Sequence, residues 1–184
     1  MGPIGKASGV ATAAAEMVAL AGRARVVCGA WKKVAAEIRT DLRHAAAVGG
    51  AGMRVLDRPF VYLDKNYVRM LGGVGPAVRQ ARRVGGRAVV VQLRGELAGI
   101  AEEAESAVEE GADLLMVDTG RLGDLRAVAG RVASRPSGRE IVLAFGGGVL
   151  PGDIPALVDA GATVLDVGRA ILDAPLVDFR LDVR

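Results

Sequence analysis

The sequence predicts an α/β domain, an open or closed β/α (TIM-like) barrel with a mostly parallel sheet. Six short runs rich in β-branched residues alternate with amphipathic stretches, which is the pattern of repeated βα units. The runs are apolar almost throughout, as in strands that are covered on both faces. Two segments, EEGADLLMVD (109–118) and DAGATVLDVG (159–168), each place a helix end, a glycine and a strand with a polar ending in that order. This order is typical of β/α barrels, and a doubly wound open sheet is the alternative.

The individual elements follow from their side-chain periodicity. The stretch 97–110 has an apolar face at helical spacing, with glutamates on the opposite face. The stretches 10–21 and 122–132 repeat this pattern, so we expect helices there as well. The expected strands are 25–30, 60–64, 88–93, 114–118, 141–145 and 163–168.

Composition restricts the class of protein. The 184 residues are 51% hydrophobic and 24% charged, which fits one soluble globular domain over residues 1–184. The single cysteine, Cys28, excludes an internal disulfide and fits the reducing cytoplasm. We expect no membrane span, since no uncharged run is long enough. Only six scattered aromatic residues argue against nucleic-acid binding. The scarcity of asparagine and glutamine fits a thermophile, or equally a GC-rich genome.

Two glycine loops follow the last two expected strands. Gly146, Gly147 and Gly148 follow the fifth strand, and Gly168 with Arg169 follows the sixth. Glycine lets backbone N–H groups approach an anion, and late strands of β/α barrels often end in a phosphate site. We therefore expect phosphate binding at these loops, and the alternative is that three glycines only form a tight turn.

The end of the first expected strand is basic. In GAWKKV, Trp31 precedes the adjacent Lys32 and Lys33. Two adjacent lysines can neutralise a pyrophosphate, and the alternative is a solvated pair at the start of a helix. Trp31 forms either an apolar wall for a ring or a plug in the mouth of the barrel.

Other strand ends carry polar side chains. Asp64, Lys65 and Asn66 are consecutive, and Asn66 is the one asparagine of the chain, with either a hydrogen-bonding role or a turn-forming role. Asp118 ends its strand and can hold Mg²⁺ or ribose hydroxyls, or else cap the next helix. The single histidine, His44, is expected to be structural, which excludes histidine triads and histidine metal sites.

Three segments carry a family resemblance. SGVAT (8–12) is similar to SGIAT, and GADLLMVD (111–118) is similar to GADIIMLD. The ending VGRAILDAPLVDFRLDV (167–183) has the shape of VGALTHSAPALDISLDI. All three patterns belong to the barrel domain of the quinolinate phosphoribosyltransferase family, which the chain resembles almost from end to end. The family's amino-terminal α/β domain is absent from this sequence.

The resemblance implies an activity and an assembly. Members of the family use Mg²⁺ and phosphoribosyl pyrophosphate to make nicotinate mononucleotide for NAD biosynthesis. Their sites are completed across subunits, so a homo-oligomer or a partner chain that supplies the missing domain is expected. The alternative is that the chain is a fragment of a longer protein.

The resemblance also carries functional roles onto single residues. Lys32 matches the lysine of TRKT, which meets phosphoribosyl pyrophosphate, and Arg54 matches the arginine of HR. Asn66 matches the asparagine of KDNH, and Asp118 matches the aspartate of LDN. The glycines that match those holding the ribose 5′-phosphate are Gly147, Gly148 and Gly168.

Several positions depart from the family pattern. Trp31 and Met53 replace an arginine and a histidine that grip the carboxylates of quinolinate. Asp64 and Lys65 reverse the family's KD, and Gln92 replaces the glutamate of EVE. A later glutamate and serine are replaced by Ala144 and Gly146.

These departures concern the acceptor side of the site. Burying a carboxylate without a donor costs several kcal/mol, and each lost charge-assisted hydrogen bond forfeits about 1.5–3 kcal/mol. Two such losses weaken binding by roughly two to four powers of ten. We therefore expect transfer from phosphoribosyl pyrophosphate to a small ring acceptor less acidic than quinolinate, with Lys32 and Asp118 catalytic and with Trp31 and Met53 beside the ring. The alternative is a non-catalytic homologue that binds a phosphorylated metabolite or a partner chain.

Overall fold

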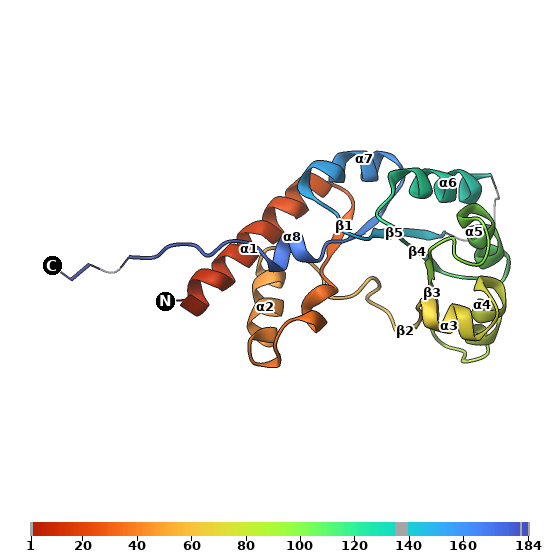
Figure 1. The fold of residues 1–184 in the computed structure, drawn as a ribbon, viewed down its shortest axis with the longest axis horizontal. Coiled ribbons are helices and arrows are strands. Elements are labelled where there is room, and N and C mark those ends of the chain that lie inside the picture. Colours follow the sequence, from red (N-terminus) through yellow and green to blue (C-terminus); the bar gives the residue numbers. More distant parts are fainter. Residues whose placement is uncertain (1, 135–139, 181, 184) are drawn as a thin grey trace.

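Six strands form one sheet with the order β1-β6-β5-β4-β3-β2 (Figure 1). The computed structural model describes residues 2–134, 140–180 and 182–183. Every strand pair in it is parallel, so the predicted α/β class with a mostly parallel sheet is confirmed. Each strand coincides with a predicted run to within a few residues. The strands are β1 (Arg25–Val27), β2 (Phe60–Leu63), β3 (Ala88–Leu93), β4 (Leu114–Asp118), β5 (Val142–Gly146) and β6 (Val164–Asp166).

The strand order distinguishes a barrel from a doubly wound sheet. From β2 to β6 each strand pairs with the next one along the chain, and β1 lies beside β6. In a doubly wound sheet the order would reverse part-way, with β1 near the centre. Within the described ranges β1 and β2 do not pair, and an isolated bridge joins Val27 to Gly52. The sheet therefore has the strand order of a β/α barrel that is open between β1 and β2.

Helices connect the strands and pack against the outer face of the sheet (Figure 1). The three predicted helical stretches correspond to α1, α5 and α6. Two short 3₁₀ helices, η1 and η2, follow β1 and β5. The helices are α1 (Gly2–Ala21), η1 (Ala30–Lys33), α2 (Ala36–Val48), α3 (Lys65–Met70), α4 (Val74–Arg82), α5 (Ile100–Glu109), α6 (Leu122–Ala133), η2 (Pro151–Asp153), α7 (Ile154–Asp159) and α8 (Arg169–Leu172).

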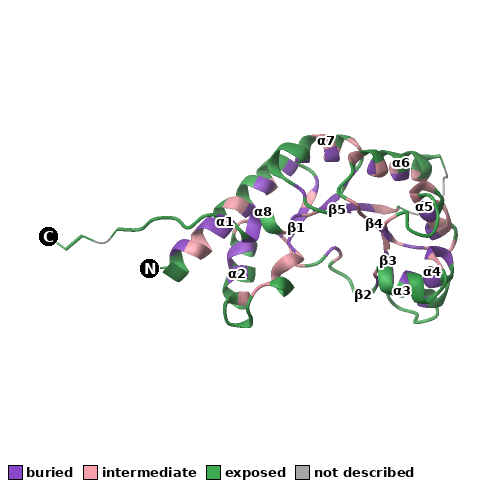
Figure 2. Ribbon diagram, in the orientation of Figure 1, coloured by how far each residue is buried: buried purple, intermediate pink, exposed green. Residues whose placement is uncertain are grey.

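Alternate strand residues belong to two separate apolar clusters. On β3, Val89 and Val91 join the larger cluster, which also contains the buried faces of the helices. Val90 joins the smaller cluster together with Leu114 of β4. Because successive strand side chains point to opposite faces, the larger cluster lies between sheet and helices, and the smaller one fills the inside of the barrel. Figure 2 shows the buried residues along the strands and on the inner sides of the helices.

The chain near the C-terminus crosses α1 at two glycines. A Cβ atom on Gly9 would lie 1.9 Å from the carbonyl oxygen of Pro175, and one on Gly5 would lie 2.6 Å from that of Val177. Glycines four residues apart lie on one face of a helix, so together they let the crossing segment approach the α1 backbone. Beyond this contact the chain extends away from the rest of the molecule (Figure 1).

The single cysteine and the single histidine lie in different environments. Cys28 is buried directly after β1. His44 lies in the middle of α2, where its side chain is exposed. In the part of the chain that the structure describes, no helix has the length and apolar character needed to cross a membrane.

Candidate active site

The carboxyl ends of the strands open into one pocket of about 360 Å³. Its lining comes from the last residues of the strands and from the loops and short helices that follow them, where β/α barrels hold their ligands. The volume is that of a small-molecule site. From the sequence-predicted residues, the pocket brings together Lys32, Lys33, Asp64, Lys65, Gln92, Asp118, Gly147, Gly148, Gly168 and Arg169.

The glycines after β5 have different reasons to lack a side chain. Gly147 and Gly148 have positive φ angles of 102° and 96°, a region that favours glycine. A Cβ atom on Gly147 would lie 2.5 Å from the backbone nitrogen of Gly120, whereas one on Gly148 would meet no atom within 4 Å. Gly147 is therefore required by the close approach of the loop after β4, and Gly148 leaves open space at the pocket.

The loop after β6 touches the loop after β1. A Cβ atom on Gly168 would lie 3.0 Å from the Cβ atom of Ala30, which begins η1. The same short helix carries Lys32 and Lys33 into the pocket lining. Two lysines are thus held on the same side of the pocket as the last glycine loop.

Asp166 is an acidic pocket residue at the end of β6. Its Oδ1 accepts a hydrogen bond of 2.9 Å from the backbone N–H of Gly29. Burial raises the pKa of Asp166 above its usual value, the Gly29 N–H opposes this rise, Asp118 adds to it, and Lys32 and Lys33 oppose it. The carboxyl group therefore lies in an environment that disfavours an uncompensated negative charge.

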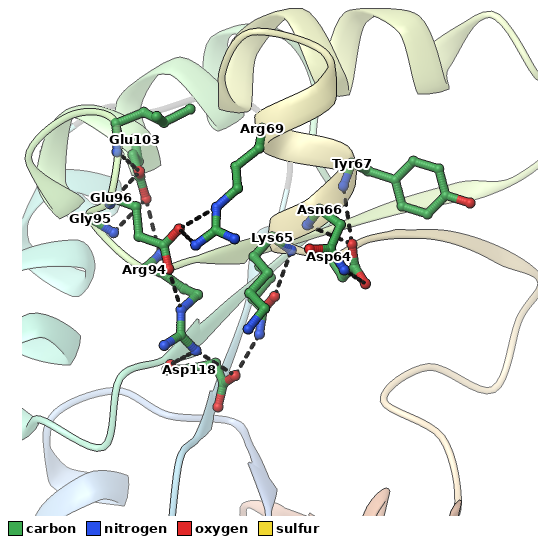
Figure 3. Close-up of polar contacts among 12 residues, drawn as sticks. Asp64, Lys65, Asn66, Tyr67, Arg69, Arg94, Gly95, Glu96, Glu103 and Asp118 are labelled. Atoms are coloured by element: carbon green, nitrogen blue, oxygen red, sulfur yellow. Dashed lines mark hydrogen bonds and ion pairs between the residues drawn. The ribbon is translucent and has the colours of Figure 1, made fainter.

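Asp118 is held by two side chains from β3 and its following loop (Figure 3). The amide nitrogen of Gln92 and the guanidinium of Arg94 donate to Asp118 Oδ2 at 2.5 and 3.2 Å. Arg94 also donates to the main-chain oxygen of Asp118 at 3.0 Å. The amide oxygen of Gln92 accepts from the backbone nitrogen of Lys65 at 2.8 Å. This network joins the ends of β2, β3 and β4.

Glu103 on α5 fixes the loop that carries Arg94 (Figure 3). The Glu103 side chain is buried, and its carboxylate accepts from the backbone nitrogens of Arg94, Gly95 and Glu96 at 2.8–3.2 Å. A longer contact of 3.5 Å reaches the nitrogen of Leu97. These bonds compensate the carboxylate for its lost hydration, so the loop is held in one conformation before any ligand arrives.

Tyr62 and Met116 supply the large apolar side chains of the pocket lining, whose other uncharged residues are Ala30, Gln92 and glycines. Met116 is almost fully buried, whereas the side chain of Tyr62 is partly exposed. Burial raises the pKa of the Tyr62 hydroxyl, and the charges of Asp118, Asp166 and Asp64 raise it further. The phenol therefore stays protonated at neutral pH and can donate a hydrogen bond.

With this geometry in place, comparison with known families decides the assignment. A model described as quinolinate phosphoribosyl transferase, C-terminal domain, matches residues 10–182. The chain belongs to this family. The family resemblance inferred from the sequence motifs is thus confirmed, and the pocket lies at the carboxyl ends of the strands of a quinolinate phosphoribosyltransferase barrel domain.

The curated relatives of this chain are longer than the chain itself. Nicotinate-nucleotide pyrophosphorylase (carboxylating) from Rattus norvegicus is 30% identical over 183 residues, as is the Homo sapiens protein. Each match covers 97% of this chain and 59% of the relative. A probable nicotinate-nucleotide pyrophosphorylase (carboxylating) from Archaeoglobus fulgidus is 26% identical, over 96% of this chain and 67% of the relative. The chain thus spans about three fifths of the length of the mammalian relatives.

Solved structures share the fold. NadC from Streptococcus pyogenes superposes with a TM-score of 0.78 at 22% identity, over 98% of this chain and 61% of that one. Nicotinate-nucleotide pyrophosphorylase from Pyrococcus furiosus superposes with a TM-score of 0.79 at 20% identity, over 94% of this chain and 49% of that one. At these identities the likeness establishes the fold.

Two residues expected beside the acceptor ring do not line the pocket. The ring of Trp31 lies 4.7 Å from the Arg43 guanidinium and 5.8 Å from that of Arg39. Trp31 therefore makes cation–π contacts with α2. Met53 is partly buried and packs against the larger apolar cluster. The side chains present at the pocket wall are instead Tyr62 and Met116.

Three other expected residues also lie outside the pocket lining. Arg54 is exposed, with its guanidinium 5.0 Å from the ring of Phe60. Asn66 is in the first turn of α3, where its backbone nitrogen donates to Asp64 Oδ1 at 2.8 Å. This bond makes Asp64 the N-cap of α3. Gly146 lies deeper, where a Cβ atom would be 3.4 Å from Asp118 Oδ1.

Four residues of the site were not predicted from the sequence. Asp166, Tyr62 and Met116 line the pocket, and Arg94 binds Asp118. The alternation of side chains between the two faces of a strand could have indicated them. Tyr62, Met116 and Asp166 each lie two residues after an inward-facing residue of the same strand, and therefore on the same face. In a run that is apolar on both faces, the sequence does not show which residues point inward.

The residues present fit a Mg²⁺ ion carried by phosphate groups, and not one held by the protein alone. Within the described ranges no group of three or more His, Cys, Asp and Glu side chains is placed to hold a metal. Oδ2 of Asp118 receives donors from Gln92 and Arg94, which leaves its Oδ1. Mg²⁺ in phosphate sites is usually bound by one or two carboxylates together with phosphate oxygens and waters.

Proposed function

We propose that the pocket binds phosphoribosyl pyrophosphate and transfers its phosphoribosyl group to a ring nitrogen of a small acceptor, as a step in NAD biosynthesis. One observation carries the proposal. The glycine loops after β5 and β6 and the lysines of η1 line the same pocket. The relatives support it, since they are named as a pyrophosphorylase that acts on a nicotinate nucleotide.

The ribose 5′-phosphate is assigned to the two glycine loops. Backbone N–H groups at glycines can approach a phosphate closely, and Gly148 faces open space at the pocket. Gly168 and Arg169 line the adjacent wall. The pyrophosphate group is assigned to Lys32 and Lys33, since paired cations match its charge.

In the proposed reaction, the bond between C1 of the ribose and the pyrophosphate oxygen breaks, and the electron pair leaves with pyrophosphate. The lone pair of the acceptor ring nitrogen forms the new bond to C1. Lys32 and Lys33 stabilise the charge that develops on the leaving group. Asp118, held in place by Gln92 and Arg94, accepts hydrogen bonds from ribose hydroxyls. Positioning and electrostatics supply the rate enhancement, so no histidine is needed.

Mg²⁺ belongs to the same proposal as an ion bound to the pyrophosphate. Asp118 Oδ1, together with phosphate oxygens and waters, would hold it. When bound, the ion would supply further neutralisation of the leaving group.

A second candidate function is binding without catalysis. It is favoured by the replacement of a family glutamate by Gln92 and by the involvement of Asp118 Oδ2 with Gln92 and Arg94. Such a protein would hold a phosphorylated metabolite in the same pocket. Release of pyrophosphate in the presence of an acceptor separates the two candidates, because only the enzyme releases it.

The test of ligand binding compares Lys32→Ala with the unaltered protein by isothermal titration calorimetry with phosphoribosyl pyrophosphate and Mg²⁺. Loss of one charge-assisted contact is expected to weaken binding about 10- to 100-fold. Arg126→Ala is the matched control, since Arg126 is exposed on α6 and does not line the pocket. Equal affinities for the unaltered protein and Lys32→Ala, or no binding at millimolar ligand, would contradict the proposal.

The proposal includes assembly and location. We infer that the chain acts as a homo-oligomer or with a partner chain, in the cytoplasm. The first inference rests on the family resemblance, which implies sites that are completed across subunits. Light scattering on the purified chain, alone and with candidate partners, measures the assembly, and a lone monomer in both samples would contradict it.

A further inference from the structure

Charge is segregated within the site pocket. The cations Lys32, Lys33, Lys65 and Arg169 come from helices that follow the strands. The carboxylates of Asp118 and Asp166 come from the last residues of β4 and β6. The third carboxylate of the lining, Asp64, caps α3 and accepts from its first backbone N–H groups. The pocket therefore has a basic outer part, which suits phosphates, and an acidic inner part. In the proposed function Asp118 meets the ribose hydroxyls and Mg²⁺, whereas Asp166 has no assigned role.

The two inner carboxylates lie on either side of a glycine. β5 lies between β4 and β6 in the sheet, and Gly146 is the last residue of β5. A Cβ atom on Gly146 would lie 3.4 Å from Asp118 Oδ1 and 3.6 Å from the Cβ atom of Asp166. Because Gly146 has no side chain, β5 places no side chain between the two acids.

Asp166 is the less compensated of the two acids. Asp118 receives the Arg94 guanidinium at 3.2 Å and the Gln92 amide. Asp166 accepts one hydrogen bond, from the Gly29 N–H to Oδ1, and in the described part of the chain no ion pair or further hydrogen bond reaches its carboxylate. Oδ2 of Asp166 is therefore an acceptor available to a ligand.

The uncharged part of the lining suits a flat ring. Tyr62 offers an aromatic ring with a hydroxyl donor, and Met116 offers a thioether, the sulfur of which would be 3.7 Å from a Cβ atom on Gly146. Ring stacking against tyrosine and sulfur contact with a ring are both favourable. The inner part of the pocket thus combines ring-sized apolar contacts with carboxylate acceptors.

We propose that this inner part, formed by Tyr62, Met116, Asp118 and Asp166, selects a ring acceptor that presents N–H donors, such as a carboxamide or an amino group, over one that presents carboxylates. The inference rests on the proposed function, and it specifies the acceptor class of that same site. A carboxylate on the ring would face Asp166 and Asp118 with like charge. An N–H donor would instead give Asp166 Oδ2 the hydrogen bond that it lacks.

The chemistry of a neutral acceptor also fits this environment. The lone pair of an aromatic ring nitrogen bonds to C1 as pyrophosphate leaves with the C1–O electron pair. The ring then carries one positive charge, and no proton or carbon dioxide has to be released. Asp118 and Asp166 would face that positive charge, and opposite charges attract most strongly where water is excluded.

The test titrates the full chain, saturated with phosphoribosyl pyrophosphate and Mg²⁺ at a temperature where turnover is negligible, with three matched probes. These are pyridine-3-carboxamide, pyridine-3-carboxylate and pyridine-2,3-dicarboxylate. The carboxamide is expected to bind at least 10-fold more tightly than either carboxylate. A dicarboxylate that binds as tightly as the carboxamide, or no binding by any probe, overturns the inference.

A variant assigns the preference to one side chain. Asp166→Asn keeps an amide oxygen for the Gly29 N–H and removes the charge, so it is expected to reduce the preference for the carboxamide at least 10-fold. Asp159→Asn is the control, because Asp159 is exposed on α7 and removes the same charge outside the pocket. An unchanged preference in Asp166→Asn overturns the role of this residue. If Asp166→Asn does not fold, the ranking of the three probes by the unaltered protein still decides the inference.

The proposed function is tested separately from the acceptor preference, by a different binding measurement. It fails if phosphoribosyl pyrophosphate does not bind to the unaltered chain in the absence of any acceptor. The probes are therefore also titrated without phosphoribosyl pyrophosphate. A carboxamide preference there, together with no binding of phosphoribosyl pyrophosphate, would support the acceptor pocket and reject the transfer reaction.

Discussion

At the scale of single residues, Glu103 shows how a buried charge can serve a neighbouring site. Its carboxylate accepts from the backbone nitrogens of Arg94, Gly95 and Glu96. The loop held in this way carries Arg94, which binds Asp118 at the pocket. Glu103 does not itself line the pocket, so its role is to position the loop.

We predict that Glu103→Ala lowers the free energy of unfolding by about 3–4 kcal/mol, because several buried N–H groups lose their acceptor. Glu103→Gln keeps one acceptor oxygen, and we expect it to lose roughly half as much. Urea unfolding of the two variants and the unaltered protein measures both changes. If neither variant loses more than about 1 kcal/mol, the bonds to the loop do not contribute to stability as described.

Cys28 gives a prediction for alkaline pH. Burial raises the pKa of the Cys28 thiol from 9.0 to about 11, the Ala30 N–H opposes the rise, and Asp166 adds to it. The stabilising contribution is complete below pH 9, since both states are then protonated. It is lost between about pH 9 and 11, where the unfolded thiol ionises and the folded one does not.

We therefore expect Cys28→Ala to lose less stability than the unaltered protein as the pH rises through this interval. The difference in slope reaches up to about 1.4 kcal/mol per pH unit, the value for one proton. Urea unfolding at several pH values between 8 and 11 measures it. Parallel curves for the two proteins would show that the folded thiol titrates normally.

At the scale of elements, the loop after β5 depends on two glycines with similar φ angles and different surroundings. Alanine at either position is strained by about 1–3 kcal/mol. Gly147→Ala adds a clash with the Gly120 backbone at 2.5 Å, whereas Gly148→Ala meets open space. We predict a clearly larger fall in melting temperature for Gly147→Ala than for Gly148→Ala, measured by circular dichroism. An equal fall in melting temperature for both variants would show that the Gly120 backbone can move away from residue 147.

The sequence predicted where the strands lie but not which of their residues face the pocket. Their positions and parallel arrangement follow from apolar runs between amphipathic helices, and all six were predicted. Which residues face the pocket did not follow, because a shift of one residue reverses the two faces of a strand. In LLMVD and TVLDVG both faces are apolar until the end, so the inward direction of Met116 and Asp166 became visible only in the sheet.

At the scale of the whole molecule, residues far apart in the sequence come together at one pocket. The sequence predicts this only because it first predicts the fold class. Lys32, Gln92 and Gly168 are far apart in sequence and line one pocket, because parallel strands in a barrel bring their carboxyl ends together. Trp31 was expected beside them, since it precedes Lys32. It packs on Arg39 and Arg43 instead, and sequence adjacency gives no information on the direction of a side chain in a 3₁₀ turn.

The central claim is that the loops after β5 and β6, together with η1, form the binding site for a phosphorylated sugar. The most direct measurement is a crystal structure of the chain with phosphoribosyl pyrophosphate and Mg²⁺. We predict density for the 5′-phosphate beside Gly148 and Gly168 and for pyrophosphate beside Lys32. Density at another surface of the molecule, or none in this pocket at millimolar ligand, would contradict the account.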